Sequence, residues 1–106
     1  DEEIHTFCTG RFGITFPQFS KLDVRGENAD PLFKWLSENT TFEGFGGAMG
    51  IAMNAVAKKM DKDFRNNGAI KWNFTKFLIG RDGEILARFE PTTAMKKVMA
   101  EVEAAL

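Results

Sequence analysis

Residues 72–79 read Trp-Asn-Phe-Thr-Lys-Phe-Leu-Ile, and this stretch decides the fold class that the sequence predicts. Aromatic and β-branched residues favour strands, and the apolar run at its end lacks alternation, as in strands covered on both faces. Residues 80–83 follow as Gly-Arg-Asp-Gly, a tight turn with the Asp-Gly hairpin signal. Residues 84–89 then return as a second strand, so we expect a β-hairpin before the last helix.

Helical patterns precede the hairpin. Residues 1–10 carry apolar side chains at helical spacing on one face, and Gly10 and Gly13 should end this helix. Asp30, a capping residue, stands before Pro31 at the first helical position, so another helix should begin there and end near residues 37–40. Its expected buried stripe consists of Leu32, Phe33, Trp35 and Leu36.

Two more helices are expected, one on each side of the hairpin. A glycine-rich loop at residues 44–50 leads into the first, whose apolar stripe should be Met49, Met53, Val56 and Met60. The last helix follows Pro91, with Thr92 or Thr93 as its cap. Its apolar face should consist of Met95, Val98, Met99, Val102 and Leu106. Residues 14–16 are a candidate short strand, in which Pro17 limits pairing.

The predicted sheet looks incomplete. A strand buried on both faces needs neighbouring strands and helices above and below it. One short strand and one hairpin can hardly supply them, and the chain opens on Asp1 without a methionine. We therefore expect a partial α/β fold, in which N-terminal strands and the first helix are missing from this chain.

Composition excludes several classes of function. Lys and Arg number 14 against 15 Asp and Glu, and this balance gives no electrostatic footprint for nucleic acid or an anionic membrane. No apolar run approaches the roughly 20 residues of a membrane span. One cysteine and one histidine argue against a disulfide scaffold and a metal site. No signal or transit peptide is visible, and we expect a cytoplasmic protein.

Cys8 is the only classical nucleophile that the chain offers. It lies near the C-terminal end of the first predicted helix, where the helix dipole disfavours a thiolate. Two interpretations stay open. Cys8 is a small buried hydrophobe beside Phe7, or it is a secondary thiol that attacks an oxidised chalcogen elsewhere.

Trp72 and Asn73 offer an indole N–H and an amide donor side by side. Such groups hydrogen-bond a thiolate or selenolate and favour its charged form. A tryptophan at the start of a strand is more often part of the core, because it buries a large area. The methionines of the third helix similarly favour a packing stripe over a metal or partner site.

Several ordered motifs resemble the glutathione peroxidase family. Residues 70–79, 81–84 and 88–93 resemble its C-terminal half. Upstream, the same order continues with residues 2–8, 14–17, 24–28 and 31–34. The resemblance covers nearly the whole chain except residues 42–69.

This resemblance implies a thioredoxin-like fold and the reduction of hydrogen peroxide and organic hydroperoxides. Residues 1–106 would be the C-terminal part of a single domain, with an inserted loop–helix segment at about residues 42–69. The family site is a peroxidatic cysteine or selenocysteine assisted by a glutamine, a tryptophan and an asparagine. Trp72 and Asn73 match the last two, and the others belong to segments before residue 1. Cys8 matches the resolving cysteine of the thioredoxin-dependent branch.

The resemblance further implies a thiol co-substrate, thioredoxin or glutathione, and no cofactor. The insertion lies where some relatives carry assembly contacts, which raises a homo-oligomer as a candidate assembly. Whether the absent nucleophile is sulfur or selenium stays open, and the fragment alone should have no turnover. The alternative function is a non-catalytic thioredoxin-fold module that binds or regulates a partner through its methionine-rich helix.

Overall fold

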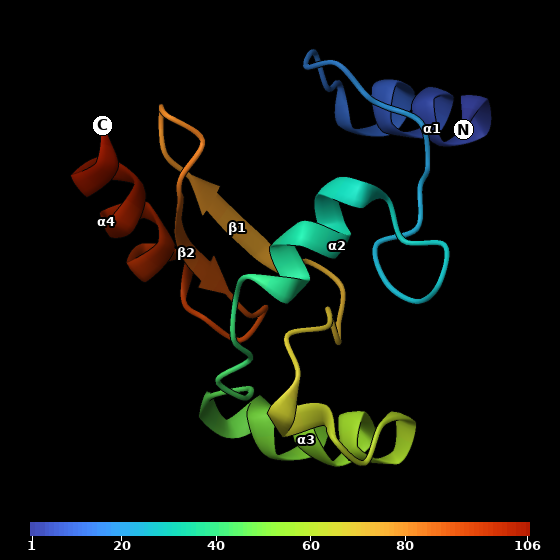
Figure 1. Cartoon of the computed structure of the whole chain (residues 1–106). Coiled ribbons are helices and arrows are strands. Elements are labelled where there is room, and N and C mark those ends of the chain that lie inside the picture. Colours follow the sequence, from blue (N-terminus) through green and yellow to red (C-terminus); the bar gives the residue numbers. More distant parts are fainter.

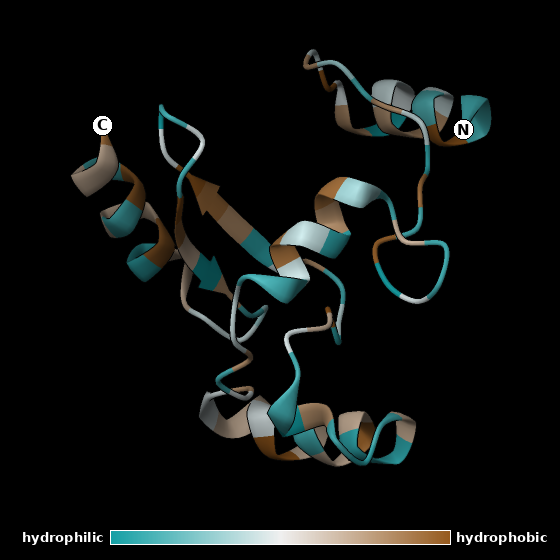
Figure 2. Ribbon diagram, viewed as in Figure 1, coloured by the Kyte–Doolittle hydropathy of each residue, from teal (hydrophilic) through white to brown (hydrophobic).

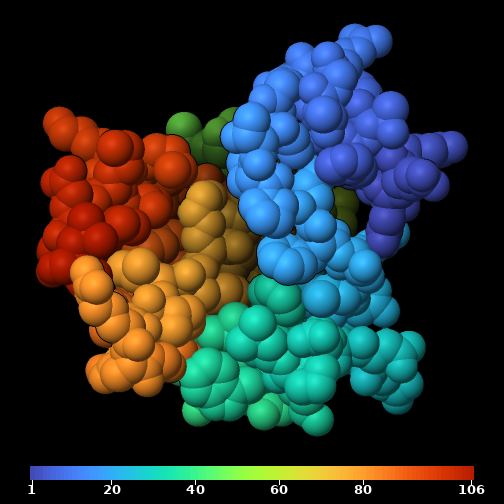
Figure 3. Space-filling view, turned by 90° about the horizontal axis from the view of Figure 1, so that it is seen from above, coloured from blue at the N-terminus to red at the C-terminus, as the bar shows by residue number.

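The computed structural model describes residues 1–106, with a single β-hairpin among four α-helices. In chain order the elements are α1 (Glu2–Phe12), α2 (Pro31–Glu38), α3 (Gly47–Met60), the short 3-10 helix η1 (Phe64–Asn66), β1 (Lys76–Ile79), β2 (Ile85–Phe89) and α4 (Met95–Ala105). The hairpin lies between α4 and α2, with α3 below it and α1 set apart (Figure 1). Seen from above, the N-terminal segment and α4 occupy opposite sides of the molecule (Figure 3).

The hairpin confirms the principal sequence prediction. β1 and β2 pair antiparallel, from Lys76 opposite Phe89 to Ile79 opposite Ile85. Gly83 has a φ of 86°, which a side chain would oppose, and its N–H bonds the Gly80 carbonyl at 3.0 Å. The Asp-Gly signal therefore marked the turn correctly.

The first strand is shorter than predicted. It begins at Lys76, whereas Trp72, Asn73 and Phe74 form a turn. Phe74 has a φ of 65°, outside the strand region, and β2 ends opposite Lys76, which leaves the preceding residues without a pairing partner. The prediction that the end of this strand is buried on both faces is also wrong for this chain, because the two-stranded sheet leaves Ile79 exposed.

The sequence signals for helix ends were correct where the bonded groups lie close together in the sequence. The Asp30 carboxylate accepts a hydrogen bond from the Leu32 N–H at 3.0 Å, which caps α2. Gly13 ends α1 in the left-handed conformation, whereas Gly10, the other predicted end, lies within the helix. The predicted threonine cap of α4 is wrong: Ala94 occupies the cap position, and the Thr92 hydroxyl instead accepts a hydrogen bond from Gly46 N–H at 3.0 Å.

Residues 14–16 do not form the predicted strand. The two-stranded sheet consists of β1 and β2 alone, so this segment has no ladder partner in the chain. Pro17 also lacks the N–H that would continue a ladder. An extended segment without a partner is not a strand, whatever its propensity.

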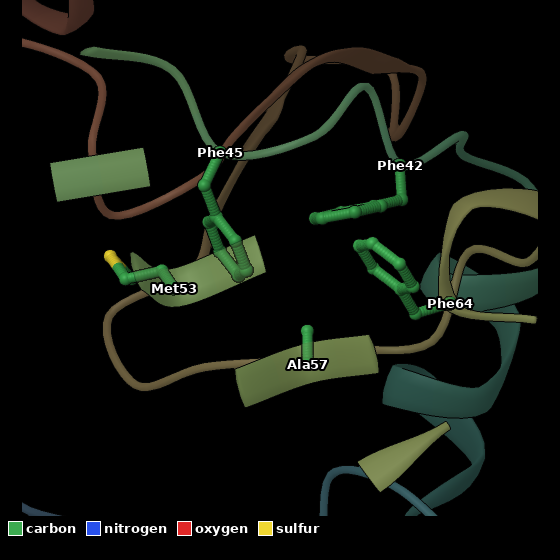
Figure 4. Close-up of a cluster of buried hydrophobic side chains, with 5 residues drawn as sticks. All are labelled: Phe42, Phe45, Met53, Ala57 and Phe64. Atoms are coloured by element: carbon green, nitrogen blue, oxygen red, sulfur yellow. The ribbon is translucent and has the colours of Figure 1, made fainter. Parts of the chain in front are cut away.

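The main apolar cluster joins the loop after α2 to α3 and η1. It comprises Phe42, Phe45, Met53, Ala57 and Phe64 (Figure 4). The buried side of α3 is Gly50, Met53 and Ala57, so the predicted stripe is wrong except at Met53. The loop at Phe45 packs directly against the backbone of α3 at Gly50, where a Cβ would overlap the Phe45 carbonyl oxygen. This contact decides which side of the helix is buried. Asn54 then bonds both the N–H and the carbonyl of Phe45 at 3.1 Å.

Much apolar surface stays exposed. Within the stripes predicted for α2 and α4, only Leu36 and Val98 are buried. Hydrophobic residues run along β1 without an element over both of its faces (Figure 2). The helices pack too sparsely in this chain for amphipathic spacing alone to dictate burial. None of the helices combines the length and the hydropathy that a membrane crossing requires.

Gly68 provides a test of this packing. A Cβ at Gly68 would overlap the carbonyl oxygens of Ser37 and Thr40, which belong to backbone at the end of α2. We expect Gly68→Ala to lower the free energy of unfolding by roughly 1–3 kcal/mol, as overpacking does. Urea unfolding of the protein that contains this chain measures the effect.

Gly10→Ala is the matched control, since Gly10 lies within α1 and nothing approaches its added Cβ within 4 Å. This change should stabilise the protein by about 0.5–1 kcal/mol through helix propensity. Equal effects of the two substitutions would contradict the close packing at Gly68.

Candidate functional site

Trp72 lies half-buried in the turn that leads into β1. Its ring packs edge-on against Phe45, with 5.8 Å between centroids and 77° between planes, and so adjoins the main apolar cluster. The turn is closed by the Thr75 hydroxyl, which donates to the Trp72 carbonyl at 3.1 Å. The ring is therefore held on one side by core packing, and the side chain is only partly withdrawn from solvent.

Asn73 follows in the same turn and is exposed. Phe74, the next residue, takes the left-handed backbone conformation. Lys76 Nζ bonds the Phe74 carbonyl at 2.8 Å and steadies the far side of the turn. Asn73 thus lies outside the apolar cluster that Trp72 adjoins, where its amide is accessible to a reactive atom.

Cys8 lies on α1, half-buried and free. Helix α1 has no buried residue and stands apart from the turn that carries Trp72 (Figure 1). Its side-chain hydrogen bonds reach only residues 18–21, through His5 with Gln18 at 2.6 Å and Asp1 with the Lys21 N–H at 3.1 Å. The structure therefore does not bring Cys8 together with Trp72 and Asn73.

A buried ionic cluster of Lys71, Arg88 and Glu90 adjoins the turn, and sequence reasoning missed it. Arg88 Nε bonds Glu90 Oε2 at 2.7 Å, with the two side chains 4% and 7% exposed. Arg88 also donates to Thr40 Oγ1 at 3.1 Å, to the Gly68 carbonyl, and to the Ala69 carbonyl at 3.2 Å. One guanidinium thus joins β2 to the end of α2 and to the segment that precedes Trp72.

Lys71, the residue before Trp72, is equally enclosed at 6% exposure. Its Nζ donates to the backbone and side-chain oxygens of Asn67, both at 2.9 Å, and to the Ala69 carbonyl at 2.7 Å. It also lies 4.5 Å from the centre of the Phe42 ring. Burial lowers the pKa of Lys71 to about 8; the Arg88 charge adds to this effect, while the charges of Glu90 and Asp61 oppose it.

Two sequence signals could have indicated this cluster. Arg88 and Glu90 are two apart at the end of a strand, where their side chains share a face. Lys71 stands directly between an apolar residue and a tryptophan, an unusual place for a solvated charge. Neither pattern is specific alone, because lysine, arginine and glutamate are mostly exposed.

A surface hollow of about 950 Å³ lies elsewhere. Its lining comes from the loop before α2, from the C-terminal half of α2 and the residues that follow it, and from Asp61 and residues 65–69. None of Cys8, Trp72 and Asn73 lines it. Most of the residues that line it are polar or charged, with charges of both signs. A catalytic centre at Trp72 would therefore be built with groups outside this hollow.

Comparison with known proteins identifies the family that this chain resembles. A family model described as glutathione peroxidase matches residues 1–37. The chain is 37% identical to "Glutathione peroxidase homolog BsaA" of Bacillus subtilis over 96% of its length and 51% of that protein. It is 41% identical to "Thioredoxin/glutathione peroxidase BtuE" of Escherichia coli, over 86% and 49%.

The chain spans about half the length of the curated relatives that it matches. A third relative, "Hydroperoxy fatty acid reductase gpx1" of Synechocystis, is 37% identical over 95% of this chain and 50% of its own. The crystal structure of Trgpx in apo form superposes with a TM-score of 0.58 at 34% identity, over 87% of this chain and 48% of that one. The fold is therefore a partial thioredoxin-like α/β fold, as predicted.

The lowered pKa of Lys71 predicts a pH-dependent stability. Between pH 8 and the ordinary lysine value of 10.5, the unfolded chain binds more protons than the folded one, so stability rises with pH across this window. Below pH 8 both states carry the proton, and the burial penalty is fully present. Lys71→Met removes this titration, so we expect the stability of the native protein to rise through the window relative to the variant.

Urea unfolding at a series of pH values measures this difference. Lys58→Met, at an exposed position of α3, is the matched control and should give a curve parallel to that of the native protein. The free energy of unfolding of the native protein minus that of Lys71→Met should therefore change with pH. If this difference stays constant from neutral pH upward, the burial of a charged lysine here is contradicted.

Proposed function

Because this chain belongs to the glutathione peroxidase family, we propose that it is part of a peroxidase that reduces hydrogen peroxide and organic hydroperoxides with a thiol. The observation that carries the proposal is the identity of 36–41% to proteins named as peroxidases over most of this chain. The exposed amide of Asn73 beside the half-buried Trp72 supports it, since such a pair can solvate an anion.

In this proposal, residues 1–106 form the C-terminal part of one thioredoxin-like domain in a cytoplasmic enzyme, and residues 42–69 are an inserted loop–helix segment. The peroxidatic cysteine or selenocysteine and its glutamine lie on polypeptide outside this chain. The exposed apolar face of α4, together with Ile79 at the end of β1, supports this arrangement, because an isolated domain rarely leaves large apolar patches in water.

The first step is the reduction of the peroxide. The peroxidatic thiolate or selenolate attacks one peroxide oxygen, the O–O bond breaks, and the other oxygen leaves as an alkoxide or hydroxide that takes a proton. The chalcogen becomes a sulfenic or selenenic acid. Trp72 and Asn73 donate hydrogen bonds to the anionic chalcogen and orient the peroxide, which makes them the catalytic residues of this chain.

The second step uses Cys8 as the resolving thiol. The Cys8 sulfur forms a bond to the oxidised chalcogen, water leaves, and thioredoxin then reduces the bridge by thiol exchange. The loose attachment of α1 supports this role, because Cys8 must travel to reach the site. If Cys8 does not react, glutathione would reduce the oxidised chalcogen directly, in place of Cys8 and thioredoxin. One relative is named for both reductants, so both routes stay part of the proposal.

A non-catalytic binding or regulatory module is the alternative function. Met49 and Met60 favour it, since both project from α3 at 70% and 61% exposure and contribute nothing to the core. Flexible methionine side chains suit an adaptable partner surface. Peroxide turnover by the protein that contains this chain separates the two functions.

Trp72→Phe tests the catalytic role of the indole. The variant keeps an aromatic ring against Phe45 but loses the N–H donor, so the first oxidation step should slow on the order of 100-fold. Rapid-mixing measurement of peroxide consumption in a single turnover reads this step. Trp35→Phe on α2 is the control, and equal rates for the two variants would reduce Trp72 to a packing residue.

Cys8→Ser tests the resolving role separately. Thioredoxin-driven turnover should be lost, because the bridge cannot form, while the first peroxide-reduction step stays nearly unchanged. Intact mass after one equivalent of peroxide should show one added oxygen in the variant and the loss of two hydrogens in the native protein. An unchanged steady-state rate with thioredoxin would contradict the role of Cys8.

A further inference from the structure

We propose that Arg88 is a positioning residue for the peroxidase site: through the carbonyls of Gly68 and Ala69 it fixes the segment that presents Trp72 and Asn73, with Lys71 as the second anchor. The catalytic part of this inference rests on the proposed peroxidase function. Its structural part concerns this chain alone.

The guanidinium is the only group that links three separate segments at this point. It projects from β2, bonds the Thr40 hydroxyl at the end of α2, and bonds the Gly68 and Ala69 carbonyls before the turn. Thr40 is itself held, because its hydroxyl donates to the Leu36 carbonyl at 2.7 Å. A planar, rigid fork of donors fixes the relative positions of its acceptors, so movement of one segment breaks bonds to the others.

The segment from Asn67 to Lys71 needs these cations because it belongs to no ladder or helix. Its carbonyls face inward and are paired with Arg88 and Lys71 instead of backbone N–H groups. The absence of a side chain at Gly68 lets the backbone approach α2 closely enough for this pairing. Unpaired buried carbonyls cost about 1–3 kcal/mol each, so loss of Arg88 should drive the segment outward to water.

The outward movement would reach Trp72 directly. Lys71 precedes it, and the Lys71 ammonium is held over Phe42, a member of the cluster against which Trp72 packs. The turn has no strand pairing of its own to resist displacement. A misplacement of a catalytic group by about 1 Å costs up to roughly 100-fold in rate.

Lysine cannot replace Arg88 in this role. Arg88 uses three nitrogens at once, on Glu90, on Thr40 and Gly68, and on Ala69. A lysine ammonium is a single point of charge and cannot span acceptors arranged around a planar fork. Glu90 also keeps one buried oxygen, Oε1, without a partner, so the pair depends on the one bond that Arg88 supplies.

The test uses Trp72 as its own reporter, in a background of the protein that contains this chain in which every other tryptophan, Trp35 included, is replaced by phenylalanine. Arg88→Lys and Arg88→Ala should each shift the Trp72 emission to the red and increase its quenching by acrylamide, while far-UV circular dichroism stays native. Arg81→Ala, at the exposed hairpin turn, is the matched control and should leave the emission unchanged. If Arg88→Ala fails to fold, Arg88→Lys decides.

Activity is the second measurement. The single-turnover oxidation rate of Arg88→Lys should fall about tenfold, a smaller loss than removal of the donor itself. The later thioredoxin-dependent step should be unaffected. Native Trp72 emission and quenching in Arg88→Lys would overturn the proposal, whatever the rate does. A shifted emission in a protein without any peroxidase activity would uphold the positioning of Trp72 and reject the proposed function instead.

Discussion

The guanidinium of Arg88 donates to segments that have no regular pairing with one another, and the region around Trp72 depends on those bonds. Burying an ion pair such as Arg88 with Glu90 adds little net stability, because desolvation offsets most of the attraction. What it supplies is geometry, since any other arrangement leaves a buried charge without partners. The short segment that precedes the hairpin therefore has one well-defined path even though it contains no helix or strand.

Local signals predicted the fold well where both partners lie close in sequence. Asp82-Gly83 marked the hairpin turn, Asp30 and Pro31 the start of α2, and Gly13 the end of α1, because each depends on a few neighbouring dihedral angles. The threonine cap of α4 failed because Thr92 is engaged by Gly46, which is distant in sequence. Helical stripes failed for a related reason: spacing selects a face, but burial needs something to pack against it.

The sequence did not predict the setting of the candidate residues, and their catalytic role stays a prediction. Trp72 and Asn73 were expected at a strand, and the structure places them in a turn because β2 ends at Phe89, opposite Lys76. The aromatic composition of the segment could not reveal where its partner stops. Lys71 and Arg88 were missed because charged residues are assigned to solvent by default, and only three-dimensional placement of the Gly68 and Ala69 carbonyls shows what they bind.

The first step of the proposed reaction needs groups that stay in place, and the second needs a group that moves. The chain contains one region of each kind. Donors that stabilise an anion must not move, and Trp72 follows a segment that two buried cations hold in place. A resolving thiol must travel, and Cys8 lies on a helix with no buried residue. Rigidity in one part of a chain and freedom in another cannot come from composition, because both parts are rich in phenylalanine. They come from the distribution of buried hydrogen bonds, which is dense around Arg88 and sparse along α1.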